Sequence, residues 1–173
     1  MAAAMTGLKG MLEKMTAFTT SVNAAAAAQE QAHNADLAAQ ATELVTIASL
    51  VEAAYLVASA DGNFSSAESD KLARQFNEAS GGRFGDDYLK TLVDASDERK
   101  KSEGADSRIK ELGSLLTDSD LRRAAIAVAS GIAWLDRGVG EKEGLVLQGL
   151  ARAFDMPITE MHKILGESKR SVS

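Results

Sequence analysis

The chain reads ADGNFSSAE at residues 60–68 and LDRGVGEKE at residues 135–143. Both stretches place an Asp, a turn with glycine, one apolar residue and a Glu at the same spacing, and 75 positions separate the copies. The agreement extends to four flanking apolar pairs: Val57 with Ile132, Ala58 with Ala133, Phe64 with Val139 and Leu72 with Leu147. We interpret this agreement as an internal repeat.

The composition favours an all-α protein. The 173 residues are 45% hydrophobic, which is enough apolar surface for one domain with a core. Much of that share is Ala, and the single Pro and few aromatics favour helix over sheet. The absence of Cys removes disulfides, thiolate metal sites and Cys nucleophiles, and it is typical of a reducing interior.

The charge argues against a nucleic-acid partner, because a net charge of −6 leaves no broad basic surface for phosphates. The basic cluster at residues 99–101 is flanked by acids, so we interpret it as a solvated helix end or loop. No run of about 18 apolar residues was identified, which predicts no membrane span. The N-terminus also lacks the Leu-rich stretch of a signal peptide. We expect a cytoplasmic location, with peripheral contact at the inner face of a membrane as an alternative.

Three segments are predicted: an N-terminal helical extension at residues 1–41, a helical domain at 42–166 and a polar tail at 167–173. The extension begins with apolar residues at steps of three or four, which predict an amphipathic helix; they are Leu8, Met11, Leu12, Met15, Phe18 and Val22. Packing on the domain, weak association with a membrane surface and binding of a protein partner are the alternatives for this helix. Residues 23–40 are Ala-rich and predict an exposed helix or arm.

The domain is expected to hold about seven helices and no strand, arranged in two pseudo-symmetric halves. Ser65 and Glu68 form an S-x-x-E capping box at one helix start, and Thr117 with Asp120 offers another cap. The polar stretch at 97–107 predicts a helix end and a surface loop. The expected helices cover about residues 42–61, 65–80, 86–96, 109–116, 121–136, 141–154 and 158–165.

The repeated acids are candidates for a metal site. Asp61 and Asp136 end one helix in each copy, and Glu68 and Glu143 lie one turn into the next. A pseudo-two-fold relation would bring the four into one acidic face, with Glu141 as a fifth. Close carboxylates repel one another, and a bound divalent cation removes that penalty. Ca²⁺ or Mg²⁺ fits an all-oxygen site, and no organic cofactor is indicated. We expect three glycines to form the turns of the two copies: Gly62 in the first, and Gly138 and Gly140 in the second.

An EF-hand and simple helix capping compete with this interpretation of the acids. The EF-hand is excluded, because counting from Asp61 places Ser66 at position 6 and Leu72 at position 12, where that loop needs Gly and Glu. Helix capping stays open, because acids are favoured in a helix's first turn and at its caps. The repetition of the acids is what favours metal binding over capping.

The segments YLVASADGNFSSAESDKL at 55–72 and LARAFDMPITEMHKIL at 150–165, with the second Asp-to-Glu turn, resemble the TerB-like family of tellurite-resistance proteins. The likeness covers about residues 42–166. It implies an all-α fold in two related halves, a link to tellurite and stress resistance, and divalent-metal binding by Asp61 and Glu68 in one copy and by Asp136 and Glu143 in the other.

The second copy departs from the family pattern, because Arg137 follows its Asp where the family usually has Gly. We expect Arg137 to pair with the acids and substitute for a cation. TerB-like domains also occur as modules joined to unrelated partners, so the fold alone does not assign a function.

Two functions stay open: a metal-binding stress-response protein, and a metal-free interaction module that docks through its N-terminal helix or acidic face. An enzyme is not predicted. The two histidines, His33 and His162, lie in the Ala-rich arm and the terminal helix, and no nucleophile motif accompanies them.

Overall fold

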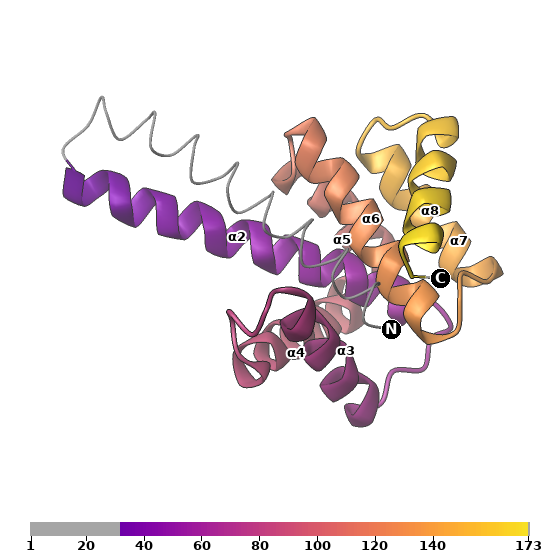
Figure 1. Cartoon of the computed structure of the whole chain (residues 1–173), viewed down its shortest axis with the longest axis horizontal. Helices are drawn as coiled ribbons and strands as arrows, with labels where there is room; N and C mark the ends of the chain where they lie inside the picture. Colours follow the sequence, from indigo (N-terminus) through magenta and orange to yellow (C-terminus); the bar gives the residue numbers. More distant parts are fainter. Residues whose placement is uncertain (1–31, 173) are drawn as a thin grey trace.

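The computed structural model describes the backbone of residues 32–172, and the side chains from residue 38 onward, as a bundle of helices (Figure 1). The helices are α2 (Ala32–Ala58), α3 (Ser66–Ala79), α4 (Asp86–Glu103), α5 (Ala105–Leu115), α6 (Ser119–Asp136), α7 (Glu141–Ala153) and α8 (Ile158–Val172). Residues 32–172 contain no strand, so the all-α prediction is confirmed. The predicted amphipathic helix at residues 8–22 lies outside the described residues.

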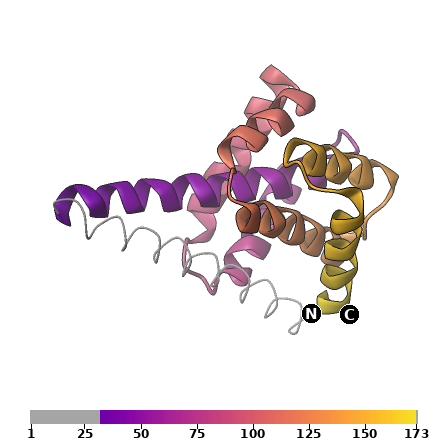
Figure 2. The same cartoon turned by 90° about the horizontal axis from the view of Figure 1, so that it is seen from above.

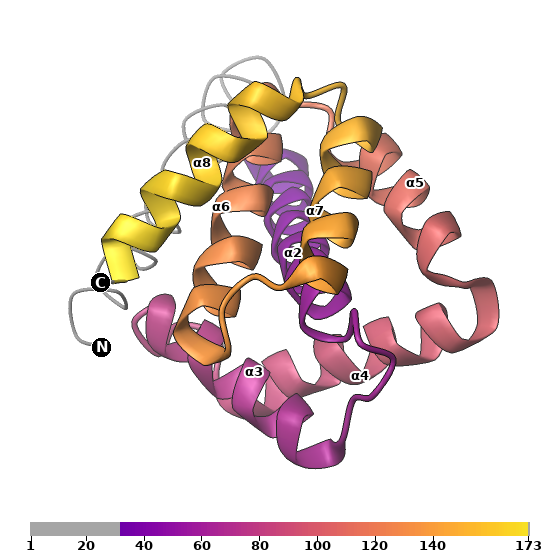
Figure 3. The ribbon, with the colours of Figure 1, turned by 90° about the vertical axis from the view of Figure 1, so that its right-hand side faces the viewer.

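Helices α2 and α6 form the centre of the bundle. Figure 3 looks along α2 and shows the other helices around it. All ten residues from Ala124 to Ala133 of α6 are buried, as is the run from Leu50 to Val57 of α2. Both runs are almost entirely apolar, with Glu52 and Ser130 as their buried polar residues, and such composition is typical of a helix enclosed by other helices. This apolar content explains why the two helices pack against each other at the core.

The helix order repeats across the two halves of the domain. Each half contains a long helix, a turn with glycine, a second helix and a third: α2, α3 and α4 in one half, and α6, α7 and α8 in the other. The third helix packs against the first in both halves, α4 against α2 and α8 against α6. The acidic turns therefore lie at equivalent places, each directly after a central helix.

The N-terminal half of α2 extends past the other helices (Figures 1 and 2). The predicted domain start at Thr42 falls inside this helix, and burial begins at Thr46. Leu44 and Val45 on the projecting part remain 50% and 49% exposed. The boundary between arm and domain is therefore a continuous helix.

Among the residues that the structure describes, one helix is long and apolar enough to cross a membrane, whereas the sequence was expected to contain no membrane span. This is the 21-residue stretch Ala38–Ala58 of α2. Of the 18 consecutive residues that are most apolar in this stretch, 61% are buried within the protein. Glu52 lies among them and forms ion pairs with two arginines. The stretch serves as the core helix of the bundle, so the structure is compatible with a soluble protein.

The predicted surface loop at residues 97–107 is wrong. Helix α4 continues to Glu103, and only Gly104, with φ 86°, separates it from α5. Glycine tolerates this left-handed conformation without the steric cost that other residues meet. The polar residues of this stretch stay helical because several of them, Arg99 and Lys100 among them, contact α2.

Two helix ends also differ from the prediction. Asp118, rather than Thr117 or Asp120, caps α6, and its carboxylate accepts hydrogen bonds from the N–H groups of Asp120 and Leu121. Helix α8 continues through the predicted polar tail to Val172. Ser168 explains this continuation, because its buried hydroxyl donates to the Ala127 carbonyl oxygen of α6 at 3.3 Å.

Two helical glycines provide a matched test of the α5–α7 packing. A Cβ added at Gly113 of α5 would lie 2.6 Å from the backbone oxygen of Ala153, whereas one added at Gly144 of α7 meets nothing within 4 Å. We expect Gly113→Ala to destabilise the protein by about 1–3 kcal/mol through overpacking. Gly144→Ala should stabilise it by up to about 1 kcal/mol through helix propensity. Chemical denaturation measures both, and a gain in both variants would contradict the close α5–α7 approach.

Candidate functional site

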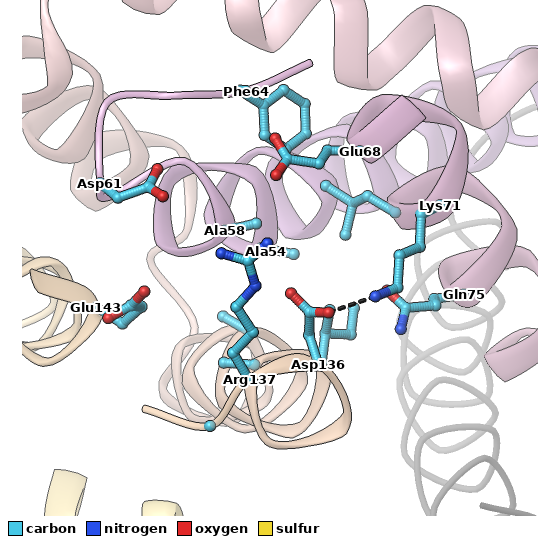
Figure 4. Close-up of a pocket in the computed structure, with 15 residues that line it drawn as sticks. Ala54, Ala58, Asp61, Phe64, Glu68, Lys71, Gln75, Asp136, Arg137 and Glu143 are labelled. Carbon is cyan, nitrogen blue, oxygen red and sulfur yellow. Dashed lines mark hydrogen bonds and ion pairs between the residues drawn. The ribbon is translucent and has the colours of Figure 1, made fainter. Parts of the chain in front are cut away.

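A pocket of about 100 Å³ lies where the ends of α2 and α6 meet the start of α3 (Figure 4). Its floor consists of small and apolar side chains from these helices: Ala54, Ala58, Leu72, Ala129, Ile132 and Ala133. Phe64 from the turn after α2 also lines it. The volume has room for several water molecules or a hydrated ion.

Four of the five predicted acids line this pocket. Asp61 and Glu68 come from the first copy of the motif, and Asp136 and Glu143 come from the second. Glu141 is not among the lining residues, because it occupies the first position of α7 on an exposed face. The pocket therefore contains one Asp and one Glu from each half of the repeat.

Local hydrogen bonds orient the acids of the first copy. Asp61 Oδ1 accepts a hydrogen bond from the Asn63 N–H at 3.0 Å. The predicted capping box of α3 is confirmed: Ser65 Oγ accepts from the Glu68 N–H at 3.1 Å, and Glu68 Oε2 accepts from the Ser65 N–H at 2.8 Å. One oxygen of each carboxylate is thus engaged, and the other has no partner in the described part of the chain.

The second copy lacks this capping box. Gly140 occupies the N-cap of α7 with an extended φ of −83°, so it offers no side chain to the helix start. Glu143 holds the position equivalent to Glu68, and its Oε2 lies 2.9 Å from where a Cβ on Gly140 would be. Within residues 38–172 the Glu143 carboxylate forms no hydrogen bond or ion pair. Its side chain therefore has more freedom to turn toward a ligand.

The two turns differ by a shift of one residue. Gly62 and Gly138 both adopt a left-handed φ, 87° and 89°, although Gly62 aligns with Arg137 in the repeat. Helix α6 also ends later than α2, at Asp136, whereas the counterpart of Ala58 is Ala133. Consequently Asp136 is the last helical residue of α6, and Asp61 lies in the turn beyond its helix.

Two cations share the pocket with the acids. Lys71 of α3 forms an ion pair and hydrogen bond with Asp136. Figure 4 shows Arg137 pointing from the end of α6 into the pocket, toward the end of α2. Contrary to the expected pairing, Arg137 forms no ion pair with any residue from 38 to 172; Lys71 is the cation that reaches Asp136. Four carboxylates against two cations leave the lining net negative.

The oxygen donors fit the chemistry of a hard divalent cation. In the present arrangement the carboxylates surround the pocket, and no three acidic or histidine side chains of the described residues converge closely enough to hold a metal ion. To hold a cation, the carboxylates that line the pocket would have to rotate inward, and Asp136 would have to leave Lys71.

Helix α4 contacts the end of α2 and the turn that carries Asp61 through side chains that were not predicted as site residues. Lys100 Nζ donates hydrogen bonds to the Ser59 carbonyl oxygen at 2.8 Å and to Ser59 Oγ at 3.0 Å. The Tyr55 hydroxyl donates to Asp97 Oδ1 at 2.6 Å. Asp97 and Lys100 are one helical turn apart, but nothing in their spacing identifies partners on α2.

Burial and nearby charges shift the pKa values of this group. Burial lowers the pKa of Lys100, and the charges of Asp97 and Asp61 act in the opposite direction. Burial and the hydrogen bond to Asp97 raise the pKa of Tyr55 above its usual range. Burial acts to raise the pKa of Asp97, but hydrogen bonds from Lys101 and Tyr55 outweigh it and leave that pKa lowered.

A buried ion-pair network around Glu52 of α2 was not predicted either. Arg99 donates from Nη2 to Glu52 Oε2 at 2.7 Å, and Arg108 donates from Nε to Glu52 Oε1 at 2.7 Å. Arg108 also donates to Glu103 at 2.8 Å. The hydrogen bond with Glu52 is the main cause that raises the pKa of Arg108. One feature of the sequence could have revealed this network: Glu52 is a single charged residue in the apolar run of α2. A charged residue at a buried position is rare unless it is paired.

Comparison of the chain with protein-family models, with curated proteins and with solved structures found no match.

Proposed function

We propose that this protein is a non-enzymatic, TerB-like cytoplasmic protein of the tellurite or stress response that binds a divalent cation, with Ca²⁺ or Mg²⁺ favoured. The observation that supports this function is that Asp61 and Glu68 line the same pocket as Asp136 and Glu143. The repeat that led to the resemblance thus supplies both halves of a single acidic site.

The chemistry of the pocket supports a cation as the ligand. Its lining carries more carboxylates than basic side chains, and carboxylate oxygens are preferred ligands of hard divalent cations. A bound cation offsets the repulsion among the acids and competes with Lys71 for Asp136. His162 is exposed on α8 and does not line the pocket.

Thermal unfolding of EDTA-stripped protein tests the proposal, with and without millimolar Ca²⁺, Mg²⁺, Mn²⁺ or Zn²⁺. A cation at about 100 times its dissociation constant is expected to add about 2.7 kcal/mol to the free energy of unfolding, because it binds only the folded state. The Asp61→Asn/Asp136→Asn variant should lose this gain, since it removes one carboxylate from each copy.

The control is the Asp106→Asn/Glu141→Gln variant, which removes the same charge from exposed acids outside the pocket. It should keep the full cation response. Equal stabilisation of the wild type and of the Asp61/Asp136 variant would mean that the cation binds elsewhere, and the proposal would fail.

A metal-free interaction module is the second candidate function. The projecting part of α2 favours it, because Leu44 and Val45 expose apolar surface beyond the bundle. In this alternative the N-terminal extension, or the acidic face, docks onto a protein partner or a membrane assembly. The absence of a response to all four cations would favour this function, and the acids would then serve mainly to cap helices.

A further inference from the structure

Lys100 of α4 contacts the start of the turn that carries Asp61. Its ammonium group donates to the carbonyl oxygen and hydroxyl of Ser59, and lies 5.8 Å from the centre of the Tyr55 ring. A positive charge at this place is favourable, because the C-terminal end of α2 presents carbonyl groups without helical partners. The Lys100 ammonium group therefore binds at the C-terminal end of α2 instead of extending into solvent.

The Ser59 carbonyl oxygen also determines the shape of the turn. It accepts a second hydrogen bond, from the Gly62 N–H at 3.0 Å, and this bond closes the turn around Asp61. The turn then continues to Asn63, whose N–H donates to Asp61 Oδ1. Lys100 thus donates to the same oxygen that orders the backbone on either side of Asp61.

The far end of the turn is held through the same helix. Phe64 lines the pocket, and its ring packs edge-on against Tyr55 with the ring centres 5.0 Å apart. Tyr55 in turn donates to Asp97, which also pairs with Lys101 at 2.7 Å. Helix α4 therefore supports the turn both through Lys100 and through the Asp97–Tyr55–Phe64 contacts.

We propose that Lys100 is a positioning residue for the acidic pocket: by fixing the Ser59 carbonyl, it presents Asp61 to a divalent cation. This inference rests on the proposed cation-binding function for its ligand, and on the geometry of the turn for the role of Lys100. A cationic side chain beside Asp61 would by itself weaken cation binding. Positioning and simple charge repulsion therefore predict opposite effects when Lys100 is removed.

The first test measures amide hydrogen exchange at Gly62 by NMR in metal-free protein. Lys100→Met should speed exchange about tenfold, because hydrogen bonds to charged groups contribute more than neutral ones and this one orders the acceptor of the Gly62 N–H. Lys110→Met removes the same charge from an exposed lysine of α5 and should leave exchange unchanged. Lys100→Arg, which keeps a charged donor, should restore slow exchange. Unchanged exchange in Lys100→Met overturns the inference.

The second test titrates the same proteins with Ca²⁺ by calorimetry. Residues that orient metal ligands typically contribute 10–100-fold to affinity, so Lys100→Met should weaken Ca²⁺ binding at least about tenfold. Lys110→Met should bind as the wild type does. Tighter binding by Lys100→Met would overturn the inference, because Lys100 would then act only as a repelling charge.

The two tests separate this inference from the function on which it rests. If wild-type protein binds no Ca²⁺, Mg²⁺, Mn²⁺ or Zn²⁺, the cation function fails, and Gly62 exchange still decides whether Lys100 orders the turn. If Lys100→Met does not fold, Lys100→Gln removes the charge while keeping a polar side chain, and the same exchange and titration results are expected of it.

Discussion

Replacing Glu52 with Ala is expected to lower the free energy of unfolding by about 3–5 kcal/mol. The Glu52 side chain is only 3% exposed, and it accepts hydrogen bonds from both Arg99 and Arg108. Without it, the largely buried guanidinium of Arg108 loses its main counter-charge, and leaving a buried charge unpaired is strongly destabilising. Urea denaturation of the wild type and the variant measures this loss.

The matched control is Glu103→Ala, which removes the other carboxylate partner of Arg108. The Glu103 side chain is 47% exposed, so water replaces the lost contact and the expected cost is at most about 1 kcal/mol. A loss below about 1 kcal/mol in Glu52→Ala as well would contradict the prediction. It would mean that α4 and α5 do not enclose the charge of α2 as the structure indicates.

Leu147→Ala is expected to destabilise the protein by about 2–5 kcal/mol. Leu147 is fully buried on α7, at the position that matches Leu72 in the repeat, and both side chains belong to the core. Truncating it removes apolar contacts and leaves a cavity that its neighbours fill only in part. The measurement is again the midpoint and slope of denaturant unfolding.

Leu145, two residues earlier on the same helix, provides the control. It is 60% exposed, against 0% for Leu147, so Leu145→Ala should change stability by no more than about 0.5 kcal/mol. The two substitutions delete the same atoms from the same helix and differ only in burial. Similar losses at both positions would show that α7 does not face the core through Leu147.

Much of the helical framework is predictable from local spacing. The Ser65–Glu68 capping box, the glycine turns and the apolar periodicity act over a few residues, so the chain shows them directly. The stretch at 97–107 misled the prediction, because its polar composition is also typical of a loop. Its helical state depends on contacts with α2 that residues 97–107 alone do not reveal.

By itself the sequence determined the helical class, the two-part repeat and the five acidic candidates, because each is a regular pattern along the chain. Only the tertiary structure decided which groups meet: Lys71 with Asp136, Lys100 with Ser59, and Arg99 and Arg108 with Glu52. These partners are 65, 41, 47 and 56 residues apart. The tertiary structure likewise left Glu141 outside the pocket and Arg137 inside it. Helix packing selects such pairs by distance and burial, and a one-dimensional pattern contains neither.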